Sequence, residues 1–175
     1  MKKRLLGLVI VLFVVVALFY GLRYLPRTIH KPMPKAAKVL VHKQARTLSL
    51  LDAQNRVIKS YTIGLGDAPV GHKQQEGDER TPEGDYVLDW RNARSRYHLS
   101  LHISYPNAED RAHAQARGVS PGGAIMIHGL PNGLSAAADM FANRDWTDGC
   151  IAVNNEEIEE IWASVENGTP IRILP

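Results

Sequence analysis

The sequence predicts one mostly β domain with a few short helices, preceded by an apolar N-terminal segment. Short runs of apolar and β-branched residues recur along the chain, and the clearest amphipathic helix comes only near its end. There is no internal repeat and no regular alternation of strands with helices, which disfavours a parallel doubly wound sheet. A chain of 175 residues can bury one hydrophobic core and is short for two full domains.

The N-terminus has the pattern of a membrane segment. Basic residues at 1–4 precede an apolar run over residues 5–22, which is about 27 Å long as a helix and close to the hydrocarbon thickness of a bilayer. No small-residue cleavage site follows this run. We therefore expect residues 1–25 to be an uncleaved signal anchor, a single transmembrane helix in the inner membrane that leaves the rest of the chain in the periplasm. Cleavage and secretion to the periplasm is the alternative.

The remaining chain divides into a linker and a folded domain. Residues 26–37 contain three prolines and several basic residues, which is typical of a tether, and the domain is expected over residues 38–175. Residues 36–175 hold 14 basic and 18 acidic side chains, a net charge of −4, so no nucleic-acid partner is expected.

Local patterns place the elements of this domain in order. Residues 64–84 contain five glycines and no hydrophobic period, which predicts a long loop, and a loop of this length in a small domain is usually functional or mobile. Helices are expected at residues 108–117, 135–141 and 156–165, the first after a capping Asn107. Strands are expected at residues 38–42, 47–51, 57–64, 86–90, 97–104, 124–128 and 171–174.

Two segments carry candidate chemistry. Cys150 is the only cysteine, which excludes an intramolecular disulfide, and it follows Thr147-Asp148-Gly149. His128 ends an apolar run and precedes Gly129. A thiolate can attack a carbonyl carbon when an imidazole accepts the thiol proton. The competing interpretation is structural, because a free cysteine is commonly a small buried core residue.

Together these segments resemble the catalytic domain of the L,D-transpeptidases, the YkuD-like family, in its murein-enzyme branch. That family has a strand ending in His-Gly and, later, a Ser/Thr-His-Gly-Cys motif. The likeness extends to Gly64 and Gly66, to a Thr-Pro-x-Gly-x-aromatic element at residues 81–86, and to Tyr105-Pro106-Asn107. It covers about residues 38–173 and implies a β-sandwich or barrel catalytic domain.

The resemblance implies a function and roles for particular residues. It implies cysteine-dependent acyl transfer on peptidoglycan stem peptides in cell-wall remodelling, with a thioester at diaminopimelate, loss of D-Ala and transfer to an amine acceptor. Cys150 would be the nucleophile, His128 the general base, and the Gly149 backbone N–H an oxyanion donor. No cofactor or metal is implied. The candidate substrate-binding residues are Tyr105, Arg111, Gly129, Thr147 and Trp146.

Two positions depart from the family pattern. Asp148 stands where a histidine is more usual, and we expect it to orient His128. Ala152 stands where an arginine is common, and an arginine elsewhere could replace its contact to a substrate carboxylate. The candidates for that role are Arg80, Arg111 and Arg144.

Other functions remain open at this point. A hydrolase of the same fold, either an L,D-carboxypeptidase or an amidase that releases wall-linked protein, would use the same residues, and a non-catalytic wall-binding module would use neither Cys150 nor His128. A zinc site at His98 and His102 is disfavoured, because residues four apart on a strand are about 13 Å apart. The glycines at 64–71 lack the Gly-Lys-Ser/Thr of a phosphate loop. The sequence predicts no particular oligomeric state.

Overall fold

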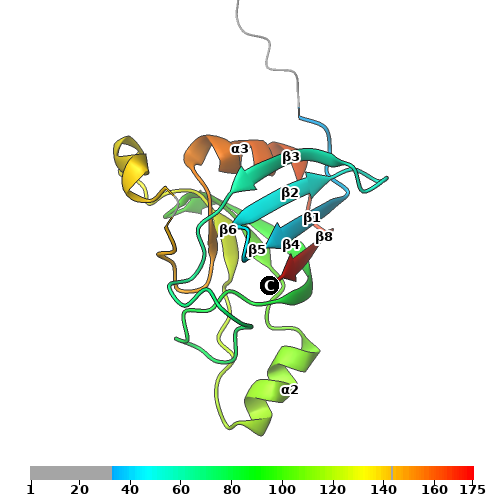
Figure 1. Cartoon of the computed structure of the whole chain (residues 1–175), viewed down its shortest axis with the longest axis vertical. Coiled ribbons are helices and arrows are strands. Elements are labelled where there is room, and N and C mark those ends of the chain that lie inside the picture. Colours follow the sequence, from blue (N-terminus) through cyan, green and yellow to red (C-terminus); the bar gives the residue numbers. More distant parts are fainter. Residues whose placement is uncertain (1–32, 143) are drawn as a thin grey trace, which may run out of the picture. The chain divides into compact units, whose positions relative to one another are not determined.

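The computed structural model describes residues 33–142 and 144–175 (Figure 1). The signal anchor expected at residues 1–25 and most of the linker expected at 26–37 therefore lie outside the described residues. Among the helices that are described, none combines the length and apolar character needed to cross a membrane.

The described part is mostly β, as predicted, with helices at its ends. Figure 1 shows α2 and α3 on opposite sides of the strands. The helices are α2 (Ala108–Ala116), α3 (Asn155–Ser164) and a short 3₁₀ helix, η1 (Ser135–Met140). The strands are β1 (Lys38–His42), β2 (Thr47–Leu51), β3 (Val57–Thr62), β4 (Gly84–Ser95), β5 (His98–Ile103), β6 (Met126–His128), β7 (Ile151–Ala152) and β8 (Thr169–Leu174).

The strands form one curled sheet. Its eight strands run in the order β3-β2-β1-β8-β4-β5-β6-β7, with β1–β8 and β6–β7 parallel and the other pairs antiparallel. Just beyond β3, Gly64 exchanges two backbone hydrogen bonds of 2.9 Å with Ala152 of β7. The chain therefore links the two outer strands of the sheet, which curls into a half-barrel and does not divide into two separate sheets.

The core lies inside this curled sheet and under α3. Alternate residues of β1 and β8 are buried, as expected for strands with one face toward a core. Helix α3 begins with a capping box in which Asn154 and Glu157 satisfy each other's backbone N–H groups. Its apolar face, including Ile158 and Ile161, is fully buried in the same core. This packing places α3 against β5, the strand that pairs with β6.

Candidate active site

The pairing of β6 with β7 brings the two motifs together. His128 on β6 lies opposite Ala152, two residues after Cys150. The backbone N–H of Met126 donates to Cys150 Sγ at 3.4 Å. Cys150 and His128 both line a cleft of about 460 Å³. The strand register therefore places the candidate nucleophile and base on one cleft.

His128 is held as a neutral base. Its side chain is 3% exposed, and its Nδ1 lies 2.7 Å from the carbonyl oxygen of Gly129. A carbonyl oxygen can only accept, so Nδ1 carries the proton and Nε2 keeps a free lone pair. Tyr97 and Trp146 pack against the ring with centroid distances of 4.6 and 5.6 Å. Burial lowers the pKa of His128, and the hydrogen bond to Gly129 opposes that shift only in part.

Cys150 is held as a neutral thiol. Burial raises the pKa of Cys150, the Met126 N–H lowers it, and the nearby Asp148 carboxylate raises it further. A raised thiol pKa beside a lowered imidazole pKa disfavours a resting thiolate–imidazolium pair. The arrangement suits transfer of the thiol proton to His128 at the moment of attack.

A tight turn presents the nucleophile. Thr147 Oγ1 donates to the Cys150 carbonyl oxygen at 2.8 Å and accepts from the Gly149 N–H at 3.2 Å. Gly149 has φ +117°, and a Cβ there would lie 2.5 Å from the Arg80 carbonyl oxygen, so the turn requires glycine. The Gly149 N–H expected as an oxyanion donor is thus engaged with Thr147. The Cys150 N–H has no hydrogen-bond acceptor within residues 33–142 and 144–175, and it is free to serve instead.

The glycine-rich segment at residues 64–84 supports this turn through backbone hydrogen bonds. The Leu65 carbonyl oxygen accepts the N–H groups of Trp146 and Thr147 at 3.1 and 3.2 Å. The Gly66 N–H donates to Thr81 Oγ1 at 3.2 Å. Asp145 accepts from the Leu65 N–H at 2.9 Å and forms an ion pair of 2.6 Å with Arg46. Neither Asp145 nor Arg46 could be singled out from the sequence, because 99 residues separate them.

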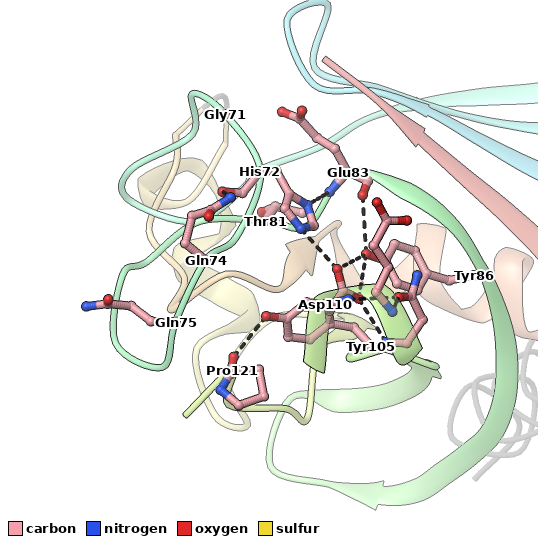
Figure 2. A network of polar contacts seen from close by, with 12 residues as sticks. Gly71, His72, Gln74, Gln75, Thr81, Glu83, Tyr86, Tyr105, Asp110 and Pro121 are labelled. Carbon is pink, nitrogen blue, oxygen red and sulfur yellow. Dashed lines mark hydrogen bonds and ion pairs between the residues drawn. The ribbon is translucent and has the colours of Figure 1, made fainter. Parts of the chain in front are cut away.

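A polar network fixes the far end of the same segment (Figure 2). His72 Nδ1 accepts from the Glu83 N–H at 2.9 Å, and its Nε2 lies 3.0 Å from Asp110 Oδ1. Tyr86 donates to the other oxygen of Asp110 at 3.0 Å. Lys43, 2% exposed, donates to Glu83 at 2.7 Å and to the Thr81 carbonyl oxygen at 2.9 Å. The loop before β4 is therefore a rigid support that leads directly to Thr81.

The structure separates the remaining predicted residues into two groups. Trp146 and Thr147 line the cleft, and Gly129 contributes through its carbonyl bond to His128. Tyr105 is buried, donates to the Pro121 carbonyl oxygen at 2.9 Å (Figure 2) and does not line the cleft. Arg111 is exposed on α2, also outside the cleft lining.

The other residues that the sequence singled out lie in different places. Asp148 lines the cleft, yet the Gly129 carbonyl, and no carboxylate, receives the His128 Nδ1 proton. Arg80 and Arg144 do not line the cleft. His98 and His102 bind different carboxylates, Glu159 and Asp89, at 2.7 and 2.6 Å. No group of three or more His, Cys, Asp or Glu suited to a metal occurs in the described part of the chain.

One arginine lines the cleft without having been predicted. Arg96 lies in the turn between β4 and β5, directly before Tyr97. Because Ser100 of β5 pairs with His128 of β6, this turn reaches the catalytic residues. The only sequence signal for Arg96 would have been that pairing, which the alternation pattern of residues 97–104 does not specify.

Comparison with known proteins agrees with this geometry. The family model described as L,D-transpeptidase catalytic domain (YkuD) matches residues 36–173. YafK of Escherichia coli (strain K12) is 32% identical over 132 residues, which are 73% of this chain and 46% of YafK. This chain thus spans about half the length of the curated relatives it matches.

Solved structures share the fold. The helical cell shape determining protein Pgp2 from Campylobacter jejuni aligns with TM-score 0.59 and 27% identity, over 77% of this chain and 46% of that one. Bd1075 of Bdellovibrio bacteriovorus aligns with TM-score 0.56 and 26% identity, over 78% of this chain and 47% of that one. The His-Gly strand, the Thr-x-Gly-Cys turn and the matched family model lead to one assignment: the chain belongs to the L,D-transpeptidase catalytic domain family.

Proposed function

We propose that this protein is a cysteine acyltransferase that acts on peptidoglycan stem peptides as an L,D-transpeptidase. The observation that carries the proposal is that Cys150 lines the same cleft of about 460 Å³ as His128, whose tautomer is fixed by the Gly129 carbonyl. Such a pair needs no cofactor for acyl transfer. The apolar N-terminal segment supports our proposal that the activity lies outside the cytoplasm, in the periplasm.

The first half of the reaction forms a thioester. Cys150 Sγ attacks the amide carbonyl carbon between diaminopimelate and the terminal D-Ala while His128 Nε2 accepts the thiol proton. The Cys150 N–H donates to the oxyanion that develops on the carbonyl oxygen. When this intermediate collapses, the C–N bond breaks, and the proton on His128 passes to the departing amine of D-Ala. The stem peptide stays bound to sulfur.

The second half returns the acyl group to an acceptor. An amine enters the cleft, gives a proton to His128 and attacks the thioester carbonyl carbon. The C–S bond breaks, and the thiolate of Cys150 recovers the proton from His128. If water replaced the amine, the same steps would give hydrolysis, so the catalytic pair by itself does not distinguish a transpeptidase from an L,D-carboxypeptidase.

Product analysis tests this proposal. The full 175-residue chain, kept in mild detergent, is incubated with purified disaccharide-tetrapeptide, with and without a free D-amino acid as amine acceptor, beside Cys150→Ala and His128→Ala. We expect cross-linked dimer, and exchange of the terminal residue when the acceptor is present, with neither product formed by the two variants. Disaccharide-tripeptide as the only product would identify a carboxypeptidase. Absence of any cysteine-dependent product would overturn the proposal.

A further inference from the structure

The catalytic cleft carries two opposite charges that the mechanism does not use. Among the residues that line it, Arg96 is the only guanidinium and Asp148 the only carboxylate. Both side chains are exposed, and within the described residues neither forms an ion pair or a side-chain hydrogen bond, with the other or with any third group. In contrast, the nearby charges behind the cleft, such as Lys73 with Asp78 at 2.8 Å, are paired.

The backbone that carries Arg96 is rigidly placed beside the catalytic base. The Arg96 carbonyl oxygen accepts the Asn132 N–H at 2.9 Å, and the Asn132 side-chain amide donates to the Ser95 carbonyl oxygen at 3.0 Å. Ser95 Oγ accepts the Tyr97 N–H at 3.0 Å, and the Tyr97 ring packs on His128. Arg96 therefore belongs to a hydrogen-bonded turn whose next residue contacts the His128 ring, and it lines the same cleft.

Asp148 enters the cleft from a different segment, the nucleophile turn. It lies two residues before Cys150, between the buried Thr147 and Gly149, and its own side chain is exposed. Burial is the main cause of the raised pKa of Cys150, and the Asp148 carboxylate is close enough to the thiol to raise that pKa further. The Met126 N–H acts in the opposite direction. One cleft of about 460 Å³ is thus lined by a cation and an anion that come from different segments, together with His128 and Cys150.

We propose that Arg96 and Asp148 together bind a zwitterionic amino-acid head group at the end of the donor's side chain, with its carboxylate on Arg96 and its ammonium on Asp148. This inference rests on the proposed function, because a diaminopimelate side chain ends in such a head group. An arginine fork binds a carboxylate through two parallel hydrogen bonds, and a carboxylate accepts readily from an ammonium. A side chain that ends in only one of these charges leaves its counterpart in the cleft unpaired.

A site for a zwitterionic head group would explain both departures from the family pattern, Asp148 in place of a histidine and Ala152 in place of an arginine. Ala152 is buried, its backbone is hydrogen-bonded to Gly64, and its methyl side chain cannot contact a carboxylate. The carboxylate contact is instead supplied from the β4–β5 turn by Arg96. Asp148 adds the recognition of the ammonium group, which a neutral histidine at the same position would not provide.

The test compares three donors that differ only in the head group. They are a tetrapeptide stem with unmodified diaminopimelate, one with the side-chain carboxyl group amidated, and one with the side-chain amine acetylated. We measure kcat/KM for D-Ala release by the full chain, Arg96→Gln, Asp148→Asn and the control Arg94→Gln. Arg94 is an exposed arginine of the same hairpin that does not line the cleft.

We expect the wild-type chain and Arg94→Gln to prefer the unmodified donor by about 10- to 100-fold over each modified one, the range for charge-assisted hydrogen bonds. Arg96→Gln should lose the preference against the amidated donor and retain that against the acetylated donor. Asp148→Asn should show the reverse pattern. This crossed selectivity would not arise if either substitution merely disturbed the fold, which a thermal melt of each variant also checks.

Several results would overturn the inference. One is a loss in Arg96→Gln that is equal for all three donors. Another is a loss of kcat/KM in Arg96→Gln that disappears when the terminal D-Ala carboxylate of the stem is amidated. That result would place Arg96 at the other end of the substrate. Wild-type turnover with no preference among the donors would overturn this inference and leave the proposed function standing. Absence of D-Ala release from every donor would overturn both.

Discussion

Gly66→Ala is expected to impair catalysis by crowding alone, without removing any reacting group. A Cβ on Gly66 would lie 1.9 Å from the Glu79 carbonyl oxygen and 2.9 Å from the Gly149 Cα. Ordinary contact begins at 3.4 Å, so the Glu79 carbonyl must move by about 1.5 Å and the nucleophile turn by about 0.5 Å. Overpacking of this kind costs about 1–3 kcal/mol in the free energy of unfolding. A displaced nucleophile should lower kcat by about 10- to 100-fold, because misplacement by about 1 Å can cost a factor of 100.

The control is Gly118→Ala, in the turn after α2. Gly118 has φ +69° and no atom within 4 Å of the added Cβ, so this variant introduces backbone strain without a clash. We expect it to lose about 1 kcal/mol of stability and to keep its kcat for D-Ala release. Stability is measured by urea unfolding of both variants. The reasoning is refuted if Gly66→Ala keeps wild-type kcat, or if it loses no more stability than Gly118→Ala.

Three further predictions follow from buried groups. Lys43→Met should lower the free energy of unfolding by about 3 kcal/mol, because it leaves Glu83 and the Thr81 carbonyl without their donor. Adding Glu83→Gln to this variant should restore part of the lost stability. Denaturant unfolding in which the effects of the two substitutions simply add would contradict this prediction. Burial lowers the pKa of His128, so as the pH drops below about 6.5 the unfolded chain protonates this histidine before the folded chain does, and stability falls. His128→Gln should therefore flatten the pH dependence of the urea midpoint between pH 5 and 7. An unchanged pH dependence in that variant would count against this prediction. Burial raises the pKa of Cys150, so its reaction with iodoacetamide should stay slow at pH 7. The reaction should be faster in Asp148→Asn, which removes a carboxylate that raises this pKa. An unchanged or slower rate in that variant would argue against the effect assigned to Asp148.

The candidate pair Cys150 and His128 could be singled out from the sequence because the spaced motifs around them resemble one family. Cys150 is the only cysteine, and both it and His128 lie in short apolar segments with adjacent glycines. Several strands were predictable for a different reason: apolar and polar residues alternate over residues 97–104, and β5 lies there with Leu101 and Ile103 buried, although Ser100 on its other face is buried too. The pattern also indicated that residues 64–84 form a functional segment, and the structure shows how: they support the nucleophile turn.

The rest depends on pairings between distant segments, which local patterns do not contain. Tyr105 and Arg111 were expected at the substrate, yet neither lines the cleft: Tyr105 is buried with its hydroxyl bonded to the Pro121 carbonyl, and Arg111 lies on α2. Arg96 was missed because its position follows from the β5–β6 register. The Gly149 N–H was expected to be an oxyanion donor, but it donates its hydrogen bond to the Thr147 hydroxyl. Backbone proximity in sequence does not show which donors are already engaged.

The central claim is that the acyl group of the donor passes through the sulfur of Cys150. Intact-protein mass spectrometry tests it most directly: the full chain is mixed with a disaccharide-tetrapeptide without added acceptor and quenched in acid after short times. The account predicts an adduct with the mass of the donor less D-Ala, mapped to the peptide that contains Cys150 and absent from Cys150→Ala. Release of D-Ala by Cys150→Ala at the wild-type rate, or an adduct on any other residue, would contradict it.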